Sequence, residues 1–201
     1  HIDAPKAIAK ELGTKQGNSV HSALFEYYTS EFYKQNNTFD LAVFKEMLAK
    51  QNLTPLEFEI WTHKFKEYEI YENERLRAGF RVLECEKEVQ SEFCGVQIKG
   101  FIDRIDADAN GDVLILDYKT GEANVNSLQL AFYEALYGGK VRSAYYALKN
   151  EPSLVSSKKS VDDLTGEIEK LKAINKTKIN FERKSGACAF CEYVTLCRRE
   201  L

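Results

Sequence analysis

The sequence lacks the features that mark several classes of protein. None of its apolar runs approaches the roughly 20 residues that a membrane-spanning helix needs, and its polar N-terminus has no apolar signal-peptide core. No internal repeat is visible. The net charge of −3 gives no overall basic signal for nucleic acid, but it does not exclude a local basic groove. These absences predict a globular, cytoplasmic protein with no membrane partner.

The sequence also has little methionine and an odd number of cysteines. The only methionine is Met47 and the first residue is His1, so we interpret the 201 residues as a fragment of a longer protein. Five cysteines, an odd number without an export signal, argue against a disulfide framework. Cys85 and Cys94 fall in predicted strands and are interpreted as small buried hydrophobic residues.

The stretch Gly100 to Gly121 organises the chain. It predicts two β-strands joined by a tight turn, because Asn110-Gly111 is a strong hairpin signal between β-branched and apolar runs. A third strand precedes this pair, and the three are expected at about residues 82–90, 94–106 and 112–119. A further strand at 141–148, reached through a helix, predicts a parallel crossover.

Helical spacing of apolar residues surrounds these strands. The expected helices are Ile8 to about Asn37 with a break at Gly17-Asn18-Ser19 and Ser19 as N-cap, Phe39 to Ala49, Thr54-Pro55 to about Ala78, Ser127 to Tyr137, and Val161 to Ile174. Residues 150–160 are expected to form a loop. The predicted fold is α/β, with a mixed sheet whose antiparallel hairpin carries the site and helices on both sides. It divides into a helical portion (1–78), a core (79–150) and a C-terminal helix with a cysteine-containing tail (151–201).

Two acids stand inside the predicted hairpin. Asp103 lies in one strand and Asp117 near the end of the next, and alternation puts Lys119 on the same face as Asp117. An acid among Leu and Ile costs free energy unless something compensates it, and a metal ion can do so. A neutral His21 from the helical layer would be a third ligand. This set suits metal-assisted phosphoryl chemistry, in which the lysine orients water or stabilises the transition state.

A structural interpretation of the same residues stays open at this point. Asp106, Asp108 and Asp112 are interpreted as turn residues that bond the local backbone. Asp117 to Lys119 could be a strand leaving the core through a charged end. His21 could be a partly buried histidine with a backbone partner.

The motifs together resemble a known family. Gly100-Phe-Ile-Asp-Arg-Ile-Asp, Leu116-Asp-Tyr-Lys-Thr-Gly and Gln129-Leu-Ala-Phe-Tyr look like the RecB-type branch of the PD-(D/E)XK nuclease superfamily. Gly17-Asn-Ser-Val-His-Ser-Ala-Leu is similar to its upstream helical motif. The resemblance runs from about Gly17 to Cys197 and implies a restriction-endonuclease-like core.

The resemblance also implies roles for individual residues. It makes His21, Asp103, Asp117 and the Tyr118 carbonyl ligands of Mg²⁺ or Mn²⁺, and Lys119 the catalytic lysine. Gln129 and Tyr133, which share a helix face at i and i+4, would line the site and contact DNA. The second acid is Asp where many relatives carry Glu, but this branch commonly has Asp.

Three clustered cysteines form a second motif. Cys188, Cys191 and Cys197 have the spacing C-x2-C-x5-C, and thiolates bind zinc or iron–sulfur clusters that normally take four ligands. The triplet resembles the iron–sulfur staple of AddB-type nucleases, whose fourth Cys lies upstream of the His motif. We therefore expect a structural [4Fe–4S] cluster in the full-length protein. This fragment, with three of the four ligands, need not hold one.

The expected function is a metal-dependent DNA exonuclease. It would be the nuclease domain of an AddB-like helicase–nuclease that processes broken DNA ends, with DNA and a helicase or nuclease subunit as partners. Three alternatives are kept. They are a non-catalytic nuclease-fold module that grips DNA or scaffolds a complex, a stand-alone CRISPR-associated or phage exonuclease, and a cysteine-cluster interaction module with a purely structural acidic strand pair.

Overall fold

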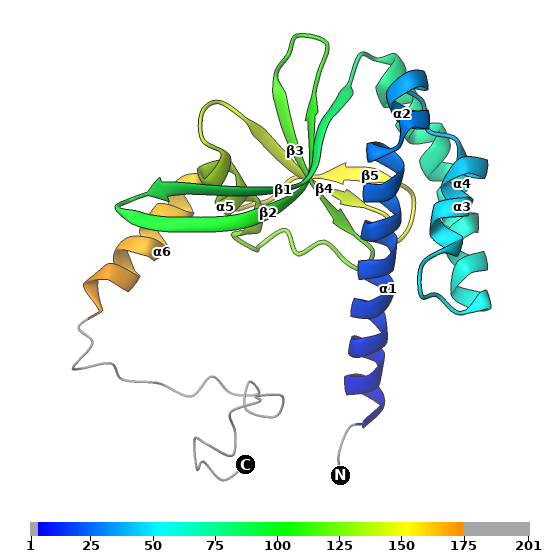
Figure 1. The fold of residues 1–201 in the computed structure, drawn as a ribbon. Helices are drawn as coiled ribbons and strands as arrows, with labels where there is room; N and C mark the ends of the chain where they lie inside the picture. The colour runs from blue at the N-terminus through cyan, green and yellow to red at the C-terminus, as the bar shows by residue number, and fades with distance from the viewer. Residues whose placement is uncertain (1–3, 175–201) are drawn as a thin grey trace. The chain divides into compact units, whose positions relative to one another are not determined.

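The computed structural model describes residues 4–174, with side chains from residue 16 onward. The elements, in chain order, are α1 (Ala4–Thr29), α2 (Glu31–Asn36), α3 (Leu41–Ala49), α4 (Pro55–Arg77), β1 (Arg81–Phe93), β2 (Val96–Ala107), β3 (Val113–Lys119), α5 (Gln129–Tyr137), β4 (Arg142–Ala147), β5 (Ser153–Val155) and α6 (Val161–Ala173) (Figure 1). The chain divides into two compact units within α6, after Gly166. The sheet and the candidate metal centre described below belong to the first unit.

The strands form one mixed sheet in the order β1-β2-β3-β4-β5. The pairs β1–β2, β2–β3 and β4–β5 are antiparallel, whereas β3 and β4, which α5 connects, are parallel. The predicted antiparallel hairpin and parallel crossover are therefore both confirmed. The short strand β5 corrects the expectation that residues 150–160 are only a loop, because three residues there pair with β4.

Helices cover both faces of the sheet. Alternation along β3 sends Leu114, Leu116 and Tyr118 to the face packed against α1, α3 and α4, and sends Ile115 to the face packed against α5. In Figure 1, α1 runs beside the sheet with α3 and α4 next to it. The arrangement confirms the α/β class, with a mixed sheet between helices as in a restriction-endonuclease-like core.

The strands β1 and β2 continue beyond the rest of the sheet. They pair along most of their lengths, but β2 pairs with β3 only from Arg104 to Ala107. Asp103 is thus the first residue of β2 beyond the β3 pairing. At Gly100, further along the free part, a Cβ would lie 3.1 Å from the Leu136 side chain, so glycine allows α5 to approach closely.

The start of α4 follows its sequence signal, but α5 begins at Gln129 with Leu128 as N-cap and no side-chain cap. The helix expected to reach Asn37 divides at Ser30, which caps α2. Thr54 and Glu57 form the two hydrogen bonds of a capping box with Pro55 at the start of α4, and Asp40 caps α3. The expected break at Gly17-Asn18-Ser19 is wrong, because α1 runs unbroken to Thr29. Gly17 serves close packing instead, since a Cβ there would lie 3.0 Å from Thr120 Oγ1.

One turn-residue expectation is confirmed and two further expectations are corrected. Asp108 is a turn residue, and its Oδ1 accepts the backbone N–H groups of Asn110 and Asp112 at 2.9 and 3.0 Å. Asp106 is not a turn residue, because it is fully buried in β2 and bonded to two arginines. Cys94 lies in the turn after β1 with φ of +51° and is half-buried, like Cys85 in β1.

A buried charged network joins the helical layer to the sheet. Arg104 on β2 is fully buried, and its donors reach Asp106 (2.6 and 2.9 Å), Glu72 (2.5 Å), Tyr118 (3.2 Å) and Tyr68 (3.4 Å). These bonds occupy all five guanidinium N–H groups. Arg75 on α4 bonds the same two carboxylates, so two positive and two negative charges balance within the core.

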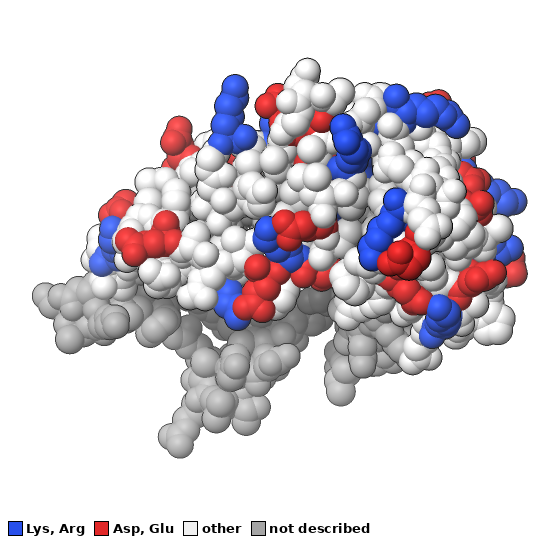
Figure 2. Space-filling model, turned by 45° about the horizontal axis from the view of Figure 1, so that its top comes forward, with Lys and Arg blue, Asp and Glu red and all other residues white. Residues whose placement is uncertain are grey.

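Acidic and basic side chains are interspersed over the surface that Figure 2 shows of the described residues, without a broad patch of one sign. Within residues 4–174, no helix combines the length and the apolar composition that crossing a membrane requires.

We expect Arg104→Met to lower the free energy of unfolding by about 3–5 kcal/mol, because it leaves buried carboxylates without their main partner. Arg142→Met is the matched control, since the exposed Arg142 pairs with Asp108 at the surface and should change stability by about 0.5 kcal/mol or less. Urea denaturation of both variants measures the difference. Equal effects would contradict a stabilising role for the network.

Candidate metal centre

His21 reaches the end of β3 from α1. Its Nε2 lies 3.0 Å from the Tyr118 carbonyl oxygen and its Nδ1 lies 3.4 Å from Asp103 Oδ2. Burial is the main cause of a pKa for His21 below its ordinary value, so the ring is neutral near pH 7. Gly17 lies one turn earlier on α1, and its close approach to Thr120 brings the helix against this end of β3.

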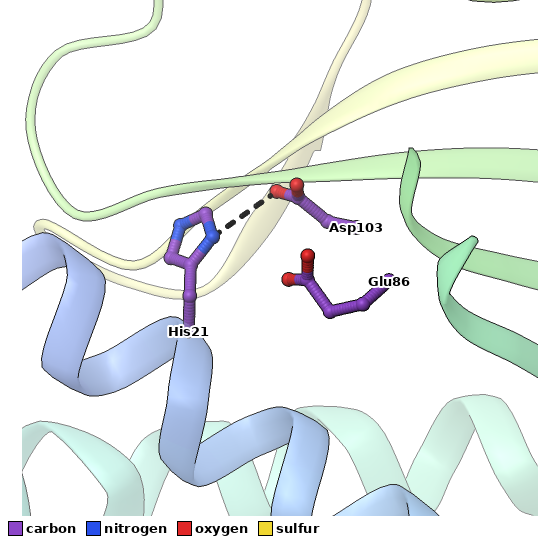
Figure 3. Close-up of side chains that lie close together, drawn as sticks. All are labelled: His21, Glu86 and Asp103. Atoms are coloured by element: carbon purple, nitrogen blue, oxygen red, sulfur yellow. Dashed lines mark ion pairs between the residues drawn. The ribbon is translucent and has the colours of Figure 1, made fainter. Parts of the chain in front are cut away.

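Two carboxylates converge on this imidazole. Figure 3 shows Asp103 and Glu86 extending from neighbouring strands toward His21, and potential ligand atoms of the three side chains all lie within 4.8 Å of one another. The group opens into a hollow of about 380 Å³. The residues that line the hollow are Asn18, His21, Ser22, Phe25, Glu86 and Asp103.

The electrostatics of the group favour a cation. Burial, followed by the charge of Asp117, raises the pKa of Asp103 to about 7. Burial and the charge of Asp103 also raise the pKa of Glu86. Such shifts arise where carboxylates repel one another with too little opposite charge nearby. Carboxylate oxygens with a neutral imidazole suit Mg²⁺ or Mn²⁺, so the residues fit a divalent metal ion.

Asp117 stands across the β2–β3 pair from Asp103, but its carboxylate is held by α5. Gln129 Nε2 donates to Asp117 Oδ1 at 2.7 Å, and the Tyr133 hydroxyl donates to the same atom at 3.3 Å. Lys119 forms an ion pair with Asp117 and donates to Gln129 Oε1 at 3.0 Å. The helix motif therefore contacts the second acid and the lysine directly.

The structure thus arranges the expected site residues as two adjoining groups. His21, Asp103 and the Tyr118 carbonyl lie together, and Asp117, Lys119, Gln129 and Tyr133 lie together. Asp103 joins the groups, because its Oδ2 accepts the backbone N–H of Tyr118 at 2.9 Å and its pKa responds to Asp117. The cysteines Cys188, Cys191 and Cys197 lie outside the described residues.

Glu86 is the residue that sequence reasoning missed. It stands two residues from both Glu84 and Glu88 in β1 and is exposed as they are, so nothing in the sequence pattern distinguishes it from them. Its neighbours Cys85 and Lys87 pair with Arg104 and Ile102, so Glu86 faces Asp103 across the hairpin. Its φ is +49°, a left-handed conformation that is unusual for a side chain of this size.

Positive φ in a non-glycine residue is unfavourable by about 1–2 kcal/mol. We therefore expect Glu86→Gly to raise the free energy of unfolding, measured in EDTA, by about 1 kcal/mol. Glu86→Gln keeps the backbone strain and removes the charge, which separates the two contributions.

The control for this substitution is Glu88→Gly on the same strand. Glu88 lies outside the positive-φ region, so the added chain entropy should lower stability by about 0.5–1 kcal/mol. A similar loss in Glu86→Gly would show that the backbone at Glu86 is unstrained.

Comparison with known proteins adds a family match. The model described as the PD-(D/E)XK nuclease superfamily matches residues 2–198. No curated protein matches the sequence.

Several solved structures resemble the chain. A repair endonuclease from Pyrococcus abyssi is 20% identical over 60% of this chain and 46% of its own, with a TM-score of 0.28. The protein SSO0001 is 16% identical over 91% and 84% of the two chains, with a TM-score of 0.37. The protein VC1899 from Vibrio cholerae is 11% identical over 82% and 47%, with a TM-score of 0.30. The chain spans about half the length of the repair endonuclease.

Proposed function

This chain belongs to the PD-(D/E)XK nuclease superfamily, and on that basis we propose that it is a metal-dependent deoxyribonuclease whose site is built on Asp103, Asp117 and Lys119. The observation that carries the proposal is the pair of cross-strand acids beside a neutral His21, with the pKa of Asp103 raised to about 7 by burial and by Asp117. A divalent cation held by such ligands, with a lysine ammonium nearby, suits phosphodiester hydrolysis.

His21, Asp103, Asp117 and the Tyr118 carbonyl would hold the metal ion, and Glu86 would add a fifth donor group, the fourth that supplies an oxygen. When bound there, a divalent cation neutralises charge developing on the phosphate and lowers the pKa of a water molecule. Asp117 is oriented for this role by Gln129 and Tyr133.

Lys119 supplies a cation of the protein's own. Its ammonium group is held between Asp117 and Gln129, on the face of β3 that carries the acid. In the reaction it orients the attacking water or stabilises charge on the phosphate oxygens. Gln129 fixes the lysine and the acid at once, because one amide group bonds both.

The finer assignment is an exonuclease of the RecB-like, AddB-type branch, acting with a helicase or nuclease subunit at broken DNA ends. It is supported by the order of the motifs around His21, Asp103, Asp117 and Gln129. The runner-up is a nuclease-fold module that binds DNA without cleaving it.

The test is degradation of end-labelled linear DNA in Mg²⁺ or Mn²⁺ by the parent chain, Lys119→Ala and Asp117→Ala. We expect metal-dependent cleavage that falls by at least about 10²-fold in each variant, since each loses transition-state stabilisation. The control Lys99→Ala removes an exposed lysine that pairs with Glu88 on the outer hairpin, and it should keep parental activity.

Product length separates the modes of cleavage. Release of mononucleotides or short oligonucleotides from ends, with a circular substrate left intact, supports the exonuclease. If the parent chain and the full-length protein bind DNA but cleave neither substrate, the DNA-binding module becomes the better description.

The triplet Cys188, Cys191 and Cys197 supports the proposal of a structural [4Fe–4S] cluster in the full-length protein, on the basis of its spacing. Iron and sulfide analysis after anaerobic purification should give about four of each per chain. Zinc without iron would contradict it.

A further inference from the structure

The strands β2 and β3, which carry the two acids, have an opposite face that packs into the charged core. Arg104 directly follows Asp103 and Tyr118 directly follows Asp117, so alternation turns their side chains away from the acids. Both side chains enter the core between the sheet and the helices, where Arg104 is fully buried and Tyr118 is 4% exposed. A displacement of either side chain therefore moves backbone that belongs to the candidate metal centre.

Tyr118 links the candidate metal centre, through its backbone, to the buried charged network, through its hydroxyl. Its carbonyl oxygen lies 3.0 Å from His21 Nε2, and its N–H donates to Asp103 Oδ2 at 2.9 Å. On the other side, its hydroxyl accepts a hydrogen bond from Arg104 at 3.2 Å. The ring packs in the core beside Tyr146, with centroids 5.7 Å apart.

The helix that carries His21 is tied to the same network. Tyr28 follows His21 by two helical turns on α1, and its hydroxyl donates to Glu72 at 3.0 Å. Glu72 also accepts from Arg104 at 2.5 Å. One carboxylate on α4 thus connects α1 with β2, and Arg104 continues the connection to β3.

We propose that Tyr118, through its hydroxyl bond to Arg104, is a positioning residue that sets the spacing between His21, Asp103 and the Tyr118 carbonyl. This inference rests on the proposed metal-binding function of that site. Tyr146 is a second buried tyrosine of the same network, and its hydroxyl donates to Glu72. It contributes no backbone group to the centre, so we assign it no positioning role.

The physical basis is the geometry that a metal ion demands of its ligands. Partners that orient ligands without touching the metal commonly change its affinity by about 10–100-fold. Loss of the Arg104 bond frees the Tyr118 ring to move in the core, and the attached carbonyl and N–H move with it. The bond is also charge-assisted, so it constrains the ring more firmly than a bond between neutral groups.

The experiment compares Tyr118→Phe with Tyr146→Phe in the whole 201-residue chain. Each substitution removes one buried hydroxyl and keeps the ring, so similar falls in thermal midpoint are expected. Mn²⁺ binding is measured by electron paramagnetic resonance without DNA. We expect the Kd of Tyr118→Phe to rise by about 10-fold and that of Tyr146→Phe by less than about 2-fold.

A second variant covers the case in which Tyr118→Phe does not fold. Tyr28→Phe loosens the attachment of α1 to Glu72 and is expected to raise the Mn²⁺ Kd by several-fold, again more than Tyr146→Phe does. Equal Mn²⁺ affinities in Tyr118→Phe and Tyr146→Phe, or no Mn²⁺ binding by the parent chain, would overturn the inference.

DNA cleavage by the same preparations keeps this inference distinct from the proposed function. A parent chain that binds Mn²⁺ in the expected order but cleaves no DNA would support the positioning role and contradict the nuclease. DNA cleavage by the parent chain together with an unchanged Mn²⁺ Kd in Tyr118→Phe would support the nuclease and contradict the positioning role.

Discussion

The guanidinium of Arg104 is the constraint on which the rest of the structure depends. It is fully buried, and each of its N–H groups has an acceptor on α4, β2 or β3. A charge in the core is tolerated only when it is paired and hydrogen-bonded, so all of these groups must be in place together. The helical layer therefore meets the sheet in one arrangement, and α1 brings His21 to the end of β3 in that arrangement.

The period of two in a strand allows the same short segments to do two tasks. In β2 and β3, one residue faces the site and the next faces the charged core, as Asp103 and Arg104 do. Close packing links the two faces, since a well-packed interior transmits displacements instead of absorbing them. Residues in the core thereby affect the geometry of the side chains proposed to hold the metal ion.

The candidate centre itself works against folding stability. Asp103 and Glu86 both have raised pKa values because burial and neighbouring acids disfavour their charged forms. Glu86 also adopts a strained backbone conformation. Proteins retain such features at functional sites, where a ligand relieves the cost. The balanced charges around Glu72 show the opposite case, since Arg104 and Arg75 overcome its burial and hold its pKa below the ordinary value.

The sequence by itself determined most of the helices and strands and the placement of several proposed site residues on them. Alternation and the Asn-Gly turn predicted the hairpin, and the spacing of Asp117 and Lys119 predicted that they share a face; these are local properties of the chain. Tertiary structure decided the rest. Gly17 stays helical because α1 must approach Thr120, Asp106 is buried because Arg75 and Arg104 neutralise it, and Glu86 joins the centre because β1 pairs it opposite Asp103. Each of these depends on partners remote in the sequence, which a local pattern does not contain.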